Sequence, residues 1–153
     1  MTRIYTAATI RRPVEAVYDY VTTPGHWPEW HPSSLGVSGA TDHSLAVGEQ
    51  VTERFNVAGR RGTVVWTVRE REAPRRWLIE GSIVGGTGGG TVAYTLTPRD
   101  DSVFFEREFV YPVPGPLLRL LDALIVRRRI QAESAEALRR LQARLEAGEA
   151  PTP

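Results

Sequence analysis

The chain has 153 residues, which suits one domain with a single sizeable core. Hydrophobic residues make up 41% of it and charged residues 24%, as in ordinary globular proteins. The net charge of +1 gives no overall field that would favour a nucleic acid, and the lack of cysteine excludes disulfides, thiolate metal sites and cysteine nucleophiles.

The sequence also argues against a membrane span. The most apolar run, residues 117–126, is short and is interrupted by Arg119 and Asp122. The first residues lack the apolar core of a signal peptide. Together with the absence of cysteine, this predicts a cytoplasmic protein with no integral membrane segment.

The first third of the chain predicts one strand and two short helices. Residues 3–10 alternate weakly, as a strand does. A helix then starts at Pro13, because proline suits the first helical position, and Val14, Val17 and Val21 form its apolar stripe. Three prolines and a glycine in residues 24–32 leave room for only one helical turn, around residues 27–30.

The middle of the chain predicts a run of strands joined by tight turns. Alternating or strand-forming segments occur at residues 35–39, 49–57, 63–72, 77–84, 91–97 and 102–111. Turn residues separate them at short spacing, which is typical of antiparallel hairpins in a meander.

The end of the chain predicts one long helix, from Pro116 to about Glu146. Its second half carries an apolar stripe at steps of three and four, whereas residues 117–126 are apolar almost all round and should be covered on more than one side. Strands in a run with helices at the ends indicate an α+β domain, in which the sheet curls around this helix.

Two motifs stand out in the first third: residues 10–21, IRRPVEAVYDYV, and residues 27–31, WPEWH. GTVAYTLTP at 90–98 and ALRRL at 137–141 accompany them. With these segments the chain resembles the START/Bet v 1-like (SRPBCC) superfamily, in its polyketide cyclase/dehydrase and lipid-transport branch. The order of predicted elements agrees with that resemblance along essentially the whole chain.

The resemblance implies a helix-grip fold: a curved antiparallel sheet of six or seven strands around the long C-terminal helix, with two short helices after the first strand. It implies one ligand-binding domain over residues 1–147, and we expect a disordered tail at 148–153. Members bind lipids, polyketides or other hydrophobic molecules between sheet and helix. Some catalyse cyclisation, and some act on partner proteins.

Arg107 and Glu70 are the candidate catalytic residues. The alternation places Arg107 on one face with Phe105 and Phe109, and Glu70 on one face with Trp66 and Val68. A charge on an inward face is costly unless it is paired, so both would be polar groups of a pocket. The alternative is a one-residue shift in register that puts both in water.

In aromatase/cyclase relatives, an arginine on the strand that matches residues 63–72 is associated with cyclisation. The corresponding inward positions here are Trp66, Val68 and Glu70, which counts against carrying that activity over.

Other candidates depend on where their segments lie. Trp27 either lies at the cavity mouth or fixes the short helices onto the sheet. His31 is a candidate general base, although its loop-like sequence favours an exposed or capping role. Tyr94 should face inward, and Gln131 and Ser134 form a polar stripe on the long helix. The predicted ligand-binding set is Trp27, Trp66, Val68, Tyr94, Phe105, Arg107, Phe109, Gln131 and Ser134.

We expect no metal site, because the three histidines lie in loop-like sequence without carboxylates at ligand spacing, and no cofactor. Three functions remain open. The leading one is binding of a small hydrophobic molecule. The second is a cyclase or dehydrase of a polyketide-type intermediate. The third is a protein–protein interaction module or homodimer that uses the apolar start of the long helix.

Overall fold

The computed structural model describes residues 1–147, so the tail expected at 148–153 lies outside the described part of the chain. Strands form the middle of the chain and helices its two ends, as the sequence predicted. In chain order the elements are β1 (Thr2–Ile10), α1 (Val14–Val21), η1 (Pro24–His26), α2 (Trp27–Trp30), β2 (Ser34–Gly39), β3 (Gln50–Val57), β4 (Arg60–Glu72), β5 (Arg76–Ile83), β6 (Gly89–Arg99), β7 (Ser102–Tyr111), α3 (Pro116–Leu121), η2 (Asp122–Val126) and α4 (Arg127–Ala147).

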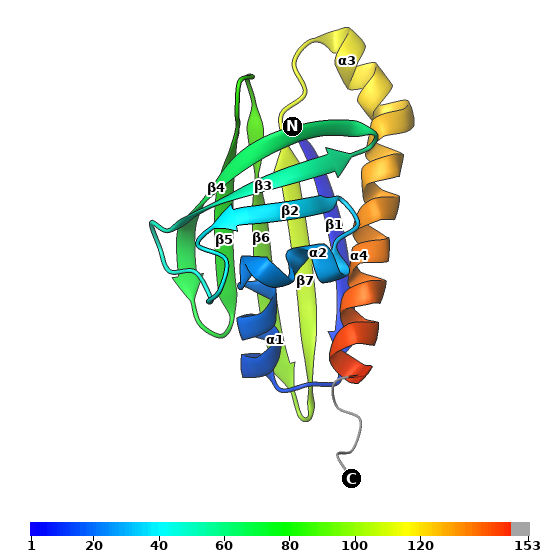
Figure 1. Ribbon diagram of the computed structural model, residues 1–153. Coiled ribbons are helices and arrows are strands. Elements are labelled where there is room, and N and C mark those ends of the chain that lie inside the picture. The colour runs from blue at the N-terminus through cyan, green and yellow to red at the C-terminus, as the bar shows by residue number, and fades with distance from the viewer. Residues whose placement is uncertain (148–153) are drawn as a thin grey trace.

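The seven strands form one antiparallel sheet in the order β1-β7-β6-β5-β4-β3-β2. Strands β2 to β7 follow one another as a meander, and β1 pairs with β7 along its whole length, from Thr2↔Tyr111 to Ile10↔Val103. The sheet is strongly curved, and α4 runs along it beside β1 (Figure 1). This arrangement confirms the α+β helix-grip fold.

The second half of the long helix packs as its periodicity predicted. Positions at steps of three and four are buried, because they face the sheet and α2. They are Ile130, Ser134, Ala137, Leu138, Leu141 and Leu145. At the other end of the domain, α1 buries Val14, Val17, Tyr18 and Val21, and α1 and α2 lie across the curved sheet (Figure 1).

The first half of the long helix differs from its prediction. Leu117 is 71% exposed and Ile125 59%, and Leu118, Leu120, Leu121 and Leu124 are exposed as well. The expectation that residues 117–126 are covered on several sides is therefore wrong. Strand β7 ends at Tyr111, and α3 extends past the end of the sheet, so no strand lies opposite it (Figure 1).

A polar anchor fixes the point where this projecting segment meets the domain. Asp122, which is 6% exposed, accepts hydrogen bonds from the Tyr111 hydroxyl at 2.6 Å and from the Thr2 hydroxyl at 2.5 Å. It lies at the first position of η2, a π-helical turn between α3 and α4. Within residues 1–147, no helix combines the length and hydrophobicity that crossing a bilayer requires.

Candidate ligand cavity

A cavity of about 1080 Å³ lies between the sheet and the long helix. Its walls are mainly apolar and aromatic side chains from β3 to β7 and from α4. They include Phe55, Val64, Trp66, Ile79, Val92, Phe109 and Ile130. The helix-grip interpretation places a ligand in this region.

The cavity has an exposed end and a buried end. The exposed end is formed by the β3–β4 and β5–β6 hairpins and by Pro112, Pro114 and Leu118. The buried end holds Trp30, Tyr94 and Arg107, which are 0%, 3% and 7% exposed. Polar side chains are concentrated at this buried end.

Arg107 is the central polar group. It lies on β7 directly opposite Tyr94 of β6 and opposite Thr6 of β1. Its Nη1 donates a hydrogen bond of 3.3 Å to the Ser134 hydroxyl on α4, and its Nε is buried without a partner. Among residues 1–147, no carboxylate lies within ion-pair distance of this guanidinium.

Two neighbours of Arg107 are held in their neutral forms. Burial raises the pKa of Tyr94 to about 12, although the positive charge of Arg107 acts in the opposite direction. Burial, and then the charges of Arg107 and Arg140, lower the pKa of His31 well below its usual value. The His31 Nδ1 accepts a hydrogen bond of 3.2 Å from the Ser33 amide, so in the neutral ring Nε2 carries the proton.

A carboxylate also faces the cavity. Glu53 on β3 accepts a hydrogen bond of 3.0 Å from the Trp66 indole. Desolvation raises its pKa, while contacts with Ser34, Trp66 and Arg107 act in the opposite direction. Alternation on residues 49–57 already placed Glu53 on one face with Val51 and Phe55, so the argument used for Arg107 could have found it.

The structure places six predicted ligand-binding residues in the cavity wall: Trp27, Trp66, Tyr94, Arg107, Phe109 and Ser134. Trp27 also donates its indole N–H to the Val21 carbonyl at 2.9 Å, so it fixes α2 against α1 as well. Val68 and Phe105 are buried in the core outside the cavity wall, and Gln131 is exposed and donates to the Tyr5 carbonyl at 3.2 Å. A ligand-binding role remains a prediction for each of them.

Glu70 does not face inward, and that expectation is wrong. The pairing of β4 with β5 shifts between Val68 and Glu70, so a β-bulge at this point reverses the alternation. Glu70 therefore lies in solvent, where it pairs with Arg76 at 3.2 Å.

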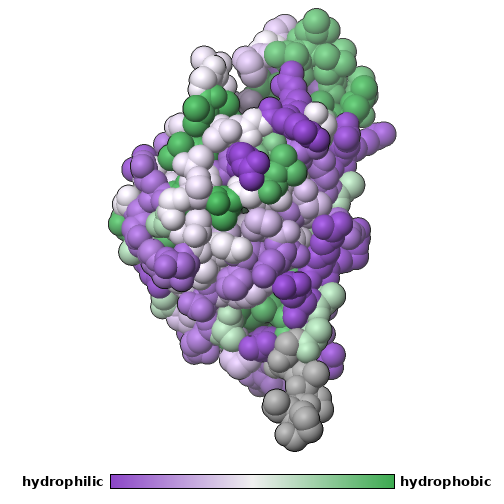
Figure 2. Space-filling model, in the orientation of Figure 1, coloured by the Kyte–Doolittle hydropathy of each residue, from purple (hydrophilic) through white to green (hydrophobic). Residues whose placement is uncertain are grey.

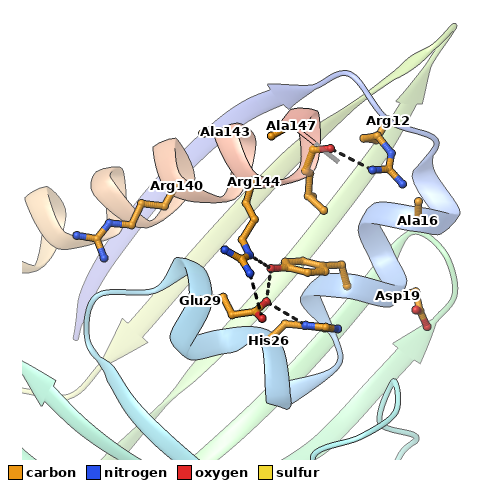
Figure 3. A pocket seen from close by; sticks show the side chains of 11 residues that line it. Arg12, Ala16, Asp19, His26, Glu29, Arg140, Ala143, Arg144 and Ala147 are labelled. Atoms are coloured by element: carbon orange, nitrogen blue, oxygen red, sulfur yellow. Dashed lines mark hydrogen bonds and ion pairs between the residues drawn. The ribbon is translucent and has the colours of Figure 1, made fainter. Parts of the chain in front are cut away.

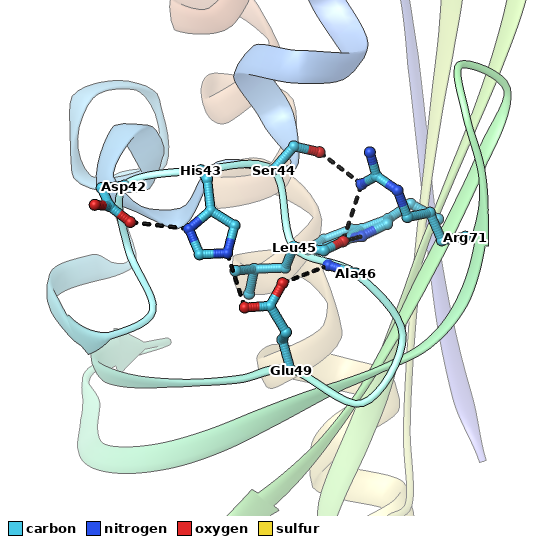
Figure 4. A network of polar contacts seen from close by, with 8 residues as sticks. Asp42, His43, Ser44, Leu45, Ala46, Glu49 and Arg71 are labelled. Carbon is cyan, nitrogen blue, oxygen red and sulfur yellow. Dashed lines mark hydrogen bonds and ion pairs between the residues drawn. The ribbon is translucent and has the colours of Figure 1, made fainter.

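Arg71 takes the inward direction instead. Its Nη1 donates to the Ser44 hydroxyl at 2.6 Å and to the Leu45 carbonyl at 2.9 Å (Figure 4). Its guanidinium also lies over the Tyr18 ring, 5.3 Å from the centroid. The same loop is held by Glu49, which accepts from the Ala46 amide and contacts His43 (Figure 4).

His31 is not exposed: its ring is half-buried and lines the cavity. Its Nδ1 accepts from the Ser33 amide, a local contact of the kind that the capping alternative implied. Trp30 and Ser34 line the cavity as well and were missed, since the proline-rich segment gave no periodicity to read.

A second hollow lies between α1, α2 and the end of α4 (Figure 3). Its polar groups bond to one another: the Tyr20 hydroxyl and His26 both contact Glu29, and Arg144 pairs with the same carboxylate at 3.2 Å. This network ties the three helices together. Within residues 1–147, no group of three or more metal-ligating side chains is close enough together to hold a metal ion.

A curved antiparallel sheet that holds a C-terminal helix, with an aromatic-lined cavity between them, defines a protein of the START-like helix-grip class. The chain belongs to the family described as polyketide cyclase/dehydrase and lipid transport, whose profile matches residues 1–146.

Solved structures with this fold include a START superfamily protein from Mycobacterium smegmatis, which is 18% identical at a TM-score of 0.65 over 95% of this chain and 97% of its own. A protein from Thermus thermophilus is 13% identical at a TM-score of 0.73 over 97% of this chain and 100% of its own. DynU16, from the dynemicin biosynthetic locus, is 21% identical at a TM-score of 0.65 over 95% of this chain, which spans 48% of DynU16.

One curated protein is similar in sequence over a shorter stretch. It is the Penitrem biosynthesis cluster 1 protein I of Penicillium ochrochloron, 36% identical over 63 residues. That match covers 40% of this chain and 41% of the fungal protein, so the chain aligns with less than half of its curated relative.

Proposed function

We propose that this protein binds a small hydrophobic molecule in the cavity between the sheet and α4. The observation that carries the proposal is the cavity itself, which has about 1080 Å³ and mostly apolar walls. Ligand sites are typically concave, apolar and furnished with a few polar groups that fix orientation. The family description, which includes lipid transport, supports the same function.

A neutral fluorescent dye, N-phenyl-1-naphthylamine, tests this proposal. We expect the emission of the dye to rise when it enters the cavity. The Ile83→Trp substitution places a larger side chain in the cavity and should weaken dye binding at least several-fold. Leu35→Trp is the matched control, because Leu35 is exposed and lies outside the cavity wall. Equal binding by both variants and the wild type, or no binding at all, would contradict the proposal.

A second candidate is a cyclase or dehydrase acting on a polyketide-type intermediate, and the position of His31 favours it. The neutral, half-buried ring of His31 presents its Nε2–H near Tyr94 and Arg107, and three such donors can together stabilise an enolate. The test is conversion of a poly-β-ketone thioester, followed by the absorbance of an aromatic product. His31→Asn should reduce turnover far more than dye binding; equal losses would point to a carrier.

A third proposal concerns the exposed apolar side chains of α3 and η2. Six of them are exposed on the segment that projects past the sheet, and Figure 2 shows hydrophobic residues gathered at that end of the molecule. We propose self-association through this face, separately from ligand binding.

A further inference from the structure

We propose that the ligand is an amphiphile with a carboxylate end group, which binds Arg107 at the buried end of the cavity while its apolar part extends toward the exposed end. This inference rests on the proposed ligand-binding function and adds the chemical class and orientation of the ligand.

The first observation is a buried positive charge that forms no ion pair with a carboxylate within residues 1–147. Arg107 is 7% exposed, and a guanidinium stays protonated in proteins. Its Nη1 donates to a neutral hydroxyl, that of Ser134, and its polar neighbour Tyr94 is neutral as well. The centroid of the Phe109 ring lies 5.9 Å from the guanidinium. Burying a charge in this way costs several kcal/mol unless an opposite charge compensates it.

The second observation is the geometry of the free edge. Since Nη1 is used by Ser134, the edge formed by Nε and Nη2 is left, and Nε has no partner within residues 1–147. Two parallel N–H groups on one edge match the two oxygens of a carboxylate. A water molecule could accept one of these hydrogen bonds, but it would not neutralise the charge.

The two carboxylates of the cavity wall, Glu53 and Glu133, have other partners. Glu53 accepts from the Trp66 indole, and burial raises its pKa, which weakens it as a counter-ion. Glu133 accepts from the Ala58 amide at 2.9 Å and from the Ser33 hydroxyl at 3.2 Å, which binds α4 to the β3–β4 hairpin. Neither forms an ion pair with Arg107.

Further donors surround the same place. Tyr94 and His31 line the cavity in their neutral forms, so a phenolic O–H and an imidazole N–H are available. The Trp30 indole N–H is buried with no partner within residues 1–147, as is the Nε of Arg107, and both belong to residues of the cavity wall. Both atoms are donors, so both lack an acceptor.

The remaining wall fixes the orientation and the size. Phe109 and Tyr111 follow Arg107 along β7 toward the exposed end, and four residues of strand span roughly 13 Å. Apolar side chains line this path, among them Phe55, Val57, Ile83 and Leu118. A single guanidinium suits a group with one negative charge, which favours a carboxylate over a phosphate monoester.

The test compares dodecanoic acid with 1-dodecanol, which share a chain and differ in the end group, as competitors of N-phenyl-1-naphthylamine at pH 7.5. The wild type should bind the acid roughly tenfold or more tightly than the alcohol. Arg107→Met should abolish this preference, because the acid should lose far more affinity than the alcohol. Arg60→Met, an exposed arginine of the same cavity wall, is the matched control and should retain the preference.

The two proposals fail in different ways. Equal affinity of the wild type for acid and alcohol, with the dye bound, overturns the carboxylate inference and leaves hydrophobic binding in place. A preference that survives in Arg107→Met overturns it as well. If neither the dye nor either competitor binds, the proposed function itself fails. The wild-type comparison needs no variant, so it decides the question even if Arg107→Met does not fold, which circular dichroism would reveal.

Discussion

The guanidinium of Arg107 on β7 donates a hydrogen bond to the hydroxyl of Ser134 on α4, at 3.3 Å and across 27 residues of sequence. This contact joins β7 to the helix at the wall of the cavity. It holds the arginine in a defined orientation, while its buried Nε has no partner within residues 1–147.

Ser134→Ala should therefore lower the free energy of unfolding by about 1–3 kcal/mol, because it removes a hydrogen-bond partner of a buried charged donor. Urea denaturation measures this directly. Ser38→Ala is the control, since Ser38 is exposed on β2, and it should change stability by less than about 0.5 kcal/mol. Equal stability of the two variants would show that Arg107 finds another partner in solution.

Glu70 and Arg71 provide a second, paired test, because the bulge in β4 gives them opposite environments. Arg71→Met removes hydrogen bonds to Ser44 and Leu45, so we expect a loss of about 1.5–3 kcal/mol in the free energy of unfolding. Glu70→Gln removes an exposed ion pair with Arg76 and should cost less than about 1 kcal/mol.

Thermal or urea denaturation of the two variants gives the comparison. A larger loss for Glu70→Gln than for Arg71→Met would mean that the strand runs without a bulge in solution, as the simple alternation predicts.

These two neighbours also show what the sequence could and could not predict. The alternation of residues 102–111 correctly placed Arg107 inward, because β7 pairs with β1 and β6 without a shift. The same reasoning failed at Glu70, because one extra residue in a strand leaves no mark on the local pattern yet exchanges the two faces.

The local sequence pattern also does not predict whether another helix or strand covers an apolar segment. The stripe on α4 identified its buried residues, since the period of a helix is a property of the segment itself. The apolar residues 117–126 gave no sign that the sheet ends at Tyr111 and leaves them exposed. The half-buried position of His31 was not predicted for a related reason: its burial depends on the cavity rather than on its neighbours in sequence.

The exposed face of α3 and η2 predicts self-association that rises with protein concentration. Light scattering after size-exclusion chromatography should show a species heavier than the 17.0 kDa chain at high concentration. Replacing Leu117 and Ile125 by Asp should return it to the monomer without loss of stability, because both side chains are exposed. A wild type that remains monomeric at all concentrations would remove the basis for a homodimer.

The half-buried ring of His31 predicts a loss of stability in mild acid. Burial lowers its pKa in the folded state, whereas the unfolded value is about 6.5. Below about pH 6.5 the unfolded chain therefore binds a proton that the folded chain does not. As the pH decreases, this group lowers the free energy of unfolding by up to about 1.4 kcal/mol per pH unit. His31→Asn should flatten the stability curve between pH 7 and pH 5.

His43 is the matched control, because its pKa moves the other way. Its ring lies between Asp42 and Glu49, and hydrogen bonds to both carboxylates raise its pKa (Figure 4). Its contribution is present below about pH 6.5 and is lost as the pH rises through the raised value, so His43→Asn should not relieve the acid sensitivity. Urea titrations at several pH values separate the two histidines. If His31→Asn left the acid-side slope unchanged, the His31 ring would be open to solvent rather than enclosed in the cavity wall.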